Sequence, residues 1–183
     1  MPGDAMHDIL EGVLQYVCKE LLKDFIFKEK FLTVEQLNER INSFDYGYFN
    51  DKNKPSPITR TTLKSENNSL KQKARQMWCL GKFLPLALDS AIPQDKEKWM
   101  HFLLLLKIVE IVFSPITNTD ELAILEGYLK EFLWKFTQLY PGLSVIPKMH
   151  YLVHYPAHIY SDIFPRIPQT SFSKSQLICF VNI

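Results

Sequence analysis

The first residues that could do chemistry are Asp4 and His7, three positions apart near the N-terminus. A carboxylate and an imidazole at this spacing could face one divalent metal, and the carboxylate is the hard oxygen ligand that Mg²⁺ or Mn²⁺ prefers. The structural alternative is that Asp4 caps a helix whose first turns carry Asp8 and Glu11, where negative charge is favoured. The composition alone favours the cap.

A row of histidines near the C-terminal end is the second candidate. A spacing of four places His150 and His154 on one helical face, as in many zinc sites. Pro156 is expected to end that helix and to take His158 out of it. The chain has no Cys-x-x-Cys to complete a zinc site, so an amphipathic turn with partly buried histidines remains an alternative.

A basic segment is the third candidate. Between positions 45 and 75, seven basic residues stand against three acidic ones, a net charge of +4, whereas residues 1–44 carry five against eight, a net charge of −3. With Tyr46, Tyr48 and Phe49 nearby, such a segment could bind a phosphate backbone, and an ordinary solvated loop is the alternative. The seven basic residues are Lys52, Lys54, Arg60, Lys64, Lys71, Lys73 and Arg75.

Composition limits what these residues can mean. A chain of 183 residues with 46% hydrophobic and 22% charged residues forms one globular domain rather than a disordered chain. The net charge of +1 leaves any attraction to nucleic acid, membranes or acidic partners to local segments. The sequence has no Walker motif, nucleophile elbow, zincin helix or Rossmann fingerprint.

The cysteines and the N-terminus indicate the compartment. Cys18, Cys79 and Cys179 are odd in number and far apart, which does not suggest a disulfide framework. The N-terminus carries acidic residues where a signal peptide needs positive charge. We therefore expect a nuclear or cytoplasmic protein that is not secreted.

Helical periodicity dominates the elements that must position these residues. Residues 8–28 predict an amphipathic helix whose polar face includes Lys19, and capping-box patterns begin further helices at Thr33 and Asn118. A helical pattern over 69–88 is interrupted at Pro85. An apolar helix is expected from Pro93 to near Phe113, and its most apolar stretch, residues 99–113, is too short to span a bilayer. A short helix begins at Pro147.

Two segments lack this periodicity. Residues 45–68 have no helical period and predict a long, mobile basic loop, with helical pattern resuming only near residue 69. After Pro156 the pattern weakens, and residues 177–181 could be a strand without a partner. The sequence predicts an all-α domain over residues 1–164, followed by a divergent and poorly ordered tail over 165–183.

Two motifs give the chain a family resemblance. The segments 2–12 (PGDAMHDILEG) and 148–156 (KMHYLVHYP) resemble the two ends of a segment in transposases of CACTA-like (CMC) DNA transposons and in proteins derived from them in animal genomes. Residues 44–48, residues 53–55 and the helix over 99–115 are also similar to that family. The resemblance covers residues 2–164.

The resemblance implies an RNase H-like fold whose DDE/D triad binds two divalent metals and cuts and joins DNA. Asp4 matches the second acid of that triad, and His7 accompanies it. The Asp-Ala-x-His pattern also resembles the catalytic core of the V(D)J recombinase. There a long helical insertion follows, and a histidine pair similar to His150 and His154 helps to bind a structural zinc. The chain is thus expected to be mainly this helical insertion, with the core strands missing.

Departures from the family pattern lead to the expected function. The first acid should lie well upstream of Asp4, and the third, a Glu, should follow Pro156 by about two dozen residues, but the chain has no acid after Asp162. Its tail looks like sequence from an alternative exon or a read-through intron. Because two-metal catalysis needs at least three carboxylates, we expect a truncated transposase-like protein without catalysis of its own.

Cofactors and partners follow from that expectation. Mg²⁺ or Mn²⁺ at Asp4, and structural zinc, belong to the ancestral enzyme, and no cofactor is expected in this chain. One alternative is a helical module that binds DNA or a protein through residues 45–75, and another is a non-functional gene-model product. DNA or protein are the expected partners, with no membrane and no small-molecule substrate.

Overall fold

The computed structural model describes residues 4–114 and 118–163. Every secondary-structure element within these residues is helical, which confirms the all-α prediction for this part of the chain. The tail predicted to be poorly ordered, the strand expected over 177–181 and Cys179 lie outside the described residues. The RNase H-like relationship of this helical domain remains a prediction.

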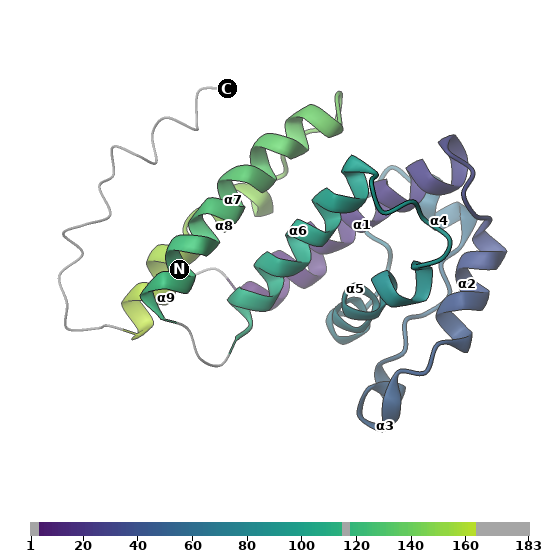
Figure 1. The fold of residues 1–183 in the computed structure, drawn as a ribbon, viewed down its shortest axis with the longest axis horizontal. Coiled ribbons are helices and arrows are strands. Elements are labelled where there is room, and N and C mark those ends of the chain that lie inside the picture. The colour runs from purple at the N-terminus through teal and green to yellow at the C-terminus, as the bar shows by residue number, and fades with distance from the viewer. Residues whose placement is uncertain (1–3, 115–117, 164–183) are drawn as a thin grey trace.

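One long helix passes through the centre of the molecule (Figure 1). It consists of η1 (Met6–Val13), α1 (Leu14–Lys23) and η2 (Asp24–Lys28), in which η1 and η2 are wider π-helical turns. Its apolar positions recur every three or four residues and are buried, and α1 packs against three later helices of the chain. The prediction of an amphipathic helix over 8–28 is confirmed. The expected place of Lys19 on its polar face is wrong, because Lys19 is fully buried.

A pair of helices covers one side of this central helix. Helix α6 (Glu97–Val112) packs against both α1 and α7 (Thr119–Leu139), and α9 (Tyr155–Ile163) packs against α7 (Figure 1). The capping box predicted at the start of α7 is confirmed: the Glu121 N–H donates to Asn118 Oδ1 at 2.9 Å, and the Asn118 N–H donates to Glu121 Oε2 at 3.2 Å.

Helices α2 (Val34–Ser43) and α5 (Ala74–Leu88) pack together beside the central helix. The predicted capping box of α2 is confirmed by reciprocal bonds between Thr33 and Gln36. Helix α5 begins at Ala74 rather than near residue 69, because Lys71 has a left-handed φ of 59° and the residues before it bond to a side chain of α1. Pro85 does not interrupt α5, since buried leucines on both sides of it keep the helix packed.

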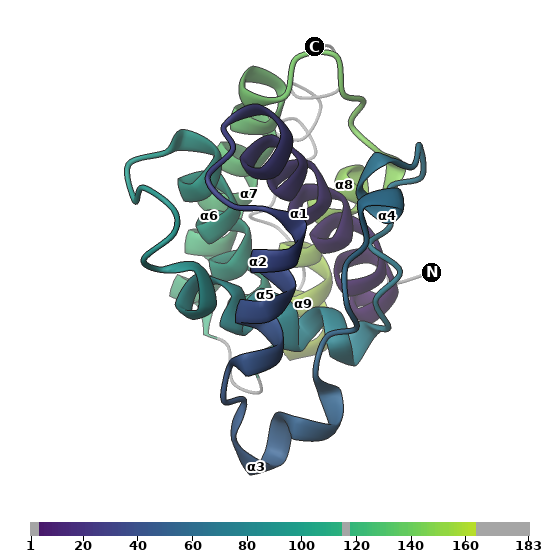
Figure 2. The ribbon, with the colours of Figure 1, turned by 90° about the vertical axis from the view of Figure 1, so that its right-hand side faces the viewer.

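The segment over 45–68 is not the continuous loop that the sequence predicts. It contains α3 (Gly47–Asn50), the 3₁₀ turn η3 (Asp51–Asn53) and α4 (Arg60–Lys64). These helices are too short to produce a periodic pattern, which is why the sequence does not reveal them. Figure 2 shows α3 at the end of a projection from the body of the molecule.

Two helices that each have a proline in their first turn complete the fold. Pro147 begins α8 (Pro147–Leu152), as predicted, and α8 ends before Pro156. Pro156 then lies in the first turn of α9, so it starts a helix as well as separating His158 from α8. Among the described residues, no helix is both long enough and apolar enough to cross a membrane.

Candidate functional site

Asp4 and His7, the expected remnant of a catalytic motif, hold a helix end. Asp4 Oδ1 accepts hydrogen bonds from the backbone N–H groups of Met6 at 3.0 Å and His7 at 3.3 Å, which is how a capping residue satisfies free amides. The His7 ring points to another partner, because its Nδ1 lies 2.9 Å from Glu11 Oε2. The structure therefore does not bring the two side chains together around one ion.

The two motifs that carry the family resemblance lie against each other. Helix α8 packs on η1, and Lys148 Nζ donates to the carbonyl oxygen of His7 at 2.9 Å. Gly12 makes this contact possible, because a Cβ at that position would lie 2.3 Å from Lys148 Cδ. Tyr155 joins the motifs a second time by donating from its hydroxyl to Asp8 Oδ2 at 3.2 Å. Asp8, which the sequence offers as a helix-end charge, is thus a buried bonding partner.

The three histidines form an exposed row, with His150 on α8, His154 in the turn that follows and His158 on α9. The ring centroids of His150 and His154 are 5.6 Å apart, and those of His154 and His158 are 6.4 Å apart. Partial burial, and then the neighbouring imidazoles, lower the pKa of His154. His150 and His154 are therefore adjacent, but they do not share one helix as expected, because α8 ends at Leu152 and His154 lies in the turn before α9. His158 extends the row.

Neither of the two cysteines that the structure describes completes a zinc site with them. Cys18 and Cys79 are both buried, and burial raises the pKa of the first thiol to about 12 and of the second to about 11. In the part of the chain that the structure describes, no three His, Cys, Asp or Glu side chains come together in a group that could hold a metal ion.

The seven basic residues of the third candidate are all exposed. Lys54 forms an ion pair of 2.7 Å with Asp51. Within the described ranges, the other six have no acidic side chain within ion-pair distance. The pKa of Glu35 is lowered mainly by its hydrogen bonds at the start of α2, and the charge of Arg60 adds to this effect. We use the name basic segment for residues 52–75, which contain all seven.

An aromatic side chain organises two of these cations. The Arg60 guanidinium lies 5.8 Å from the ring centroid of Phe27, and Lys64 Nζ lies 5.5 Å from it. Both distances are in the range of cation–π attraction. One turn of α4 therefore presents two positive charges side by side above η2.

Polar side chains, one buried and two partly buried, hold the first half of the basic segment in place. Asn38 on α2 bonds both backbone groups of Ile58, with Nδ2 donating to its carbonyl and Oδ1 accepting from its N–H, each at 2.8 Å. Gln72 bonds Ser56 in the same two-way fashion. Gln76 Nε2 donates to the carbonyl oxygen of Lys54 at 3.2 Å. These bonds place Lys54 beside the start of α5.

Lys19 and Gln15 hold the second half from the central helix. Lys19 Nζ donates to three oxygens: the carbonyl and hydroxyl of Ser65, at 2.8 and 2.9 Å, and the carbonyl of Asn67 at 2.5 Å. Gln15 Oε1 accepts from the Leu70 N–H at 3.0 Å, and its Nε2 donates to the Gln72 carbonyl at 2.9 Å. Burying an ammonium is costly unless its donors are satisfied, and here all three are.

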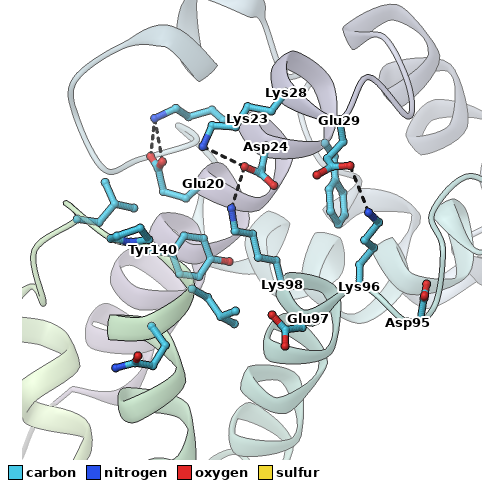
Figure 3. Close-up of a pocket in the computed structure, with 15 residues that line it drawn as sticks. Glu20, Lys23, Asp24, Lys28, Glu29, Asp95, Lys96, Glu97, Lys98 and Tyr140 are labelled. Carbon is cyan, nitrogen blue, oxygen red and sulfur yellow. Dashed lines mark hydrogen bonds and ion pairs between the residues drawn. The ribbon is translucent and has the colours of Figure 1, made fainter.

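A pocket of about 760 Å³ lies between η2, the start of α6 and the end of α7 (Figure 3). Each of its lysines is neutralised by an acid, with Asp24 accepting from both Lys98 at 2.8 Å and Lys28 at 3.2 Å. Burial raises the pKa of Asp24, but its bonds to these two lysines outweigh that effect and lower it. The remaining pairs are Lys23 with Glu20 and Lys96 with Glu29. The pocket therefore offers an anionic ligand no unpaired lysine.

A cluster of buried aromatic side chains lies between α6 and α7, and two of its polar atoms have no hydrogen-bond partner among the described residues. His101 stacks on Phe132 at 4.6 Å, and its Nε2 lies 3.0 Å from the Phe132 carbonyl oxygen. Because a carbonyl only accepts, Nε2 carries the proton and Nδ1 is a bare acceptor. Nδ1 and the hydroxyl of Tyr140 have no hydrogen-bond partner among the described residues. Burial lowers the pKa of His101 to about 4.

The side chains that hold the basic segment in place were not identified from the sequence. Lys19 and Gln15 are spaced as an i, i+4 pair among apolar residues, and this placement on a predicted buried stripe is the signal that could have revealed them. Asn38, Gln72 and Tyr155 give no comparable signal, because their partners lie 20, 16 and 147 positions away.

No family model, curated protein or solved structure matches this chain.

Proposed function

We propose that this chain is a transposase-derived helical module that binds nucleic acid through the basic segment and has no catalysis of its own. The observation that carries the proposal is the exposure of seven cations on residues 52–75, six of them without an acidic partner among the described residues. Cations that are not neutralised within the protein attract phosphates and release the counterions bound to them. A nuclear location is part of this proposal.

The anchoring of the basic segment supports the same function. A loop that must be ordered on binding loses conformational entropy at that moment, and this cost weakens the complex. Here Lys19, Gln15, Asn38 and Gln72 fix the backbone that carries the cations. The segment is thus arranged before a ligand arrives.

The absence of catalysis rests on the acids of this chain. Asp4 matches one of three triad acids, and its Oδ1 accepts two backbone N–H groups. Phosphoryl transfer by two metals needs at least three carboxylates to hold the ions. We expect the purified chain neither to nick nor to join DNA in Mg²⁺ or Mn²⁺. Metal-dependent cleavage that disappears in Asp4→Ala would refute this part of the proposal.

Charge reversal tests the binding surface. The test variant changes Lys52, Lys54 and Lys64 to Glu, and its binding to a labelled DNA oligonucleotide is measured by fluorescence anisotropy at low salt. The matched control changes Lys107 on α6 and Lys130 and Lys135 on α7 to Glu. It alters the net charge of the protein by the same amount as the test variant. We expect the test variant to lose binding and the control to keep it. Equal affinities for the two variants would contradict the proposal.

A further inference from the structure

Tyr48 and Phe49 of α3 are the most exposed large apolar side chains among the described residues. Figure 2 shows α3 at the end of the projection. Their exposed fractions are 91% and 88%. Aromatic rings contribute to folding by leaving water, so the packing of the described residues gives no reason for two adjacent rings in this position. We call this pair the aromatic tip. Its rings stand almost perpendicular, at 82°, with centroids 5.6 Å apart.

The chain just before the aromatic tip is firmly attached to the body. Tyr46 is buried, donates from its hydroxyl to the carbonyl of Ile41 at 2.9 Å, and contacts Phe44 and Phe83 edge to face. Gly47 then turns the chain outward with a φ of 71°, a conformation that glycine adopts without strain. The aromatic tip is thus held away from the core by the buried side chain of Tyr46 and the rings that pack against it.

Positive charge continues from the aromatic tip along the protein. Lys52 and Lys54 follow it within six residues, and the bond from Gln76 to the Lys54 carbonyl brings this stretch beside Lys73 and Arg75 at the start of α5. Asp51 neutralises only Lys54. In this part of the described structure, Lys52, Lys73 and Arg75 have no acidic partner.

We propose that the aromatic tip stacks on unpaired bases, so that the preferred ligand is single-stranded nucleic acid rather than intact duplex. This inference rests on the function proposed above. In a duplex the faces of the bases are covered by their neighbours, whereas unpaired bases are free to stack on aromatic side chains while nearby cations follow the backbone. Exposed rings beside uncompensated cations fit this ligand, because single-stranded nucleic acid presents unpaired bases and phosphates together.

The experiment compares a labelled single-stranded oligo(dT) of 20 nucleotides with a random-sequence duplex of equal length, by fluorescence anisotropy at low salt. The variants are Tyr48→Ala with Phe49→Ala, and Trp134→Ala as a control that removes an aromatic ring 60% exposed on α7. Each lost stacking contact is expected to weaken single-strand binding about fivefold or more. We expect the wild type to prefer the single strand, the double variant to lose that preference, and the control to keep it.

The outcomes separate the inference from the proposed function. Salt-dependent binding that is equal for both ligands, or a preference unchanged in the double variant, would overturn the stacking role and leave the basic segment as a phosphate-binding surface. The same holds if single-strand binding is lost only when the lysines are reversed. Absence of binding to either oligonucleotide at low salt would overturn the proposed function, and the inference with it.

Discussion

The hydroxyl of Tyr155 donates a 3.2 Å hydrogen bond to Asp8 Oδ2 and so joins residues 147 positions apart. Both side chains are buried. Burial, together with the charge of Asp8, holds the pKa of the Tyr155 hydroxyl well above its usual range, which keeps it protonated as a donor. The pair links η1 near the N-terminus to α9, so two segments far apart in the sequence are held against each other.

Removing the donor of this bond is expected to destabilise the fold. Tyr155→Phe leaves a buried carboxylate oxygen without its partner, which costs about 1–3 kcal/mol of unfolding free energy. Tyr151→Phe is the matched control, because Tyr151 is half exposed on α8. Urea denaturation of both variants measures the difference. A loss no larger than that of the control would show that the bond does not stabilise the chain.

Lys19 is expected to matter more than its neighbour on the same helix. Lys19→Met removes the donor of three bonds and leaves two partly buried carbonyls unsatisfied, which is expected to cost about 2–3 kcal/mol. Lys23→Met, which removes a partly exposed pair with Glu20, is expected to cost less than about 1 kcal/mol. Hydrogen exchange over residues 65–70 should accelerate in the first variant alone. Unchanged exchange in Lys19→Met would contradict the anchoring role.

The long helices could be predicted from the sequence because their signals are local. The caps at Thr33 and Asn118 and the apolar stripe of residues 8–28 depend on residues within a few positions of one another. Pro85 was misleading, because local chemistry disfavours it in a helix while the packing of its buried neighbours retains it.

The arrangement of the basic segment and the aromatic tip could be predicted from the sequence only in part. The basic residues are visible as composition, but their arrangement depends on side chains that satisfy distant backbone groups. A lysine on a helix predicts a solvated face, and nothing local indicates that Lys19 instead turns inward to Ser65. The exposure of Tyr48 and Phe49 is equally hidden, because Tyr46, only two positions earlier, is buried.

Acid is expected to weaken the fold through His101. This group has a pKa of about 4 in the folded chain and near 6.5 when unfolded, so between these values the unfolded chain binds a proton that the folded chain does not. Its stabilising contribution is complete above pH 6.5 and is lost as the pH falls to about 4, which amounts to about 3 kcal/mol.

Unfolding free energies measured across that range test the assignment. His101→Phe should flatten the dependence between pH 4 and 6.5, whereas His150→Phe, at an exposed position, should leave it as in the wild type. If the wild type and His101→Phe share one slope, another group is responsible.

The histidine row is expected to be a relic without stoichiometric zinc. His150 and His154 are adjacent, but a structural zinc needs four ligands, and both described cysteines are buried as thiols. Metal analysis of the purified chain should find well under one zinc per molecule. One equivalent of zinc that is lost in His154→Ala would show that the site is still occupied.

The most direct test of the account is the salt dependence of DNA binding. If six unpaired cations of the basic segment neutralise phosphates, a plot of log affinity against log salt concentration should be linear with a slope of about −4 to −5. Lys→Gln at Lys52, Lys64 or Lys71 should each reduce the magnitude of that slope by about 0.7–0.9, and Lys107→Gln on α6 should not. A flat plot, or a slope that changes as much for Lys107 as for the basic segment, would contradict the claim that this surface binds nucleic acid.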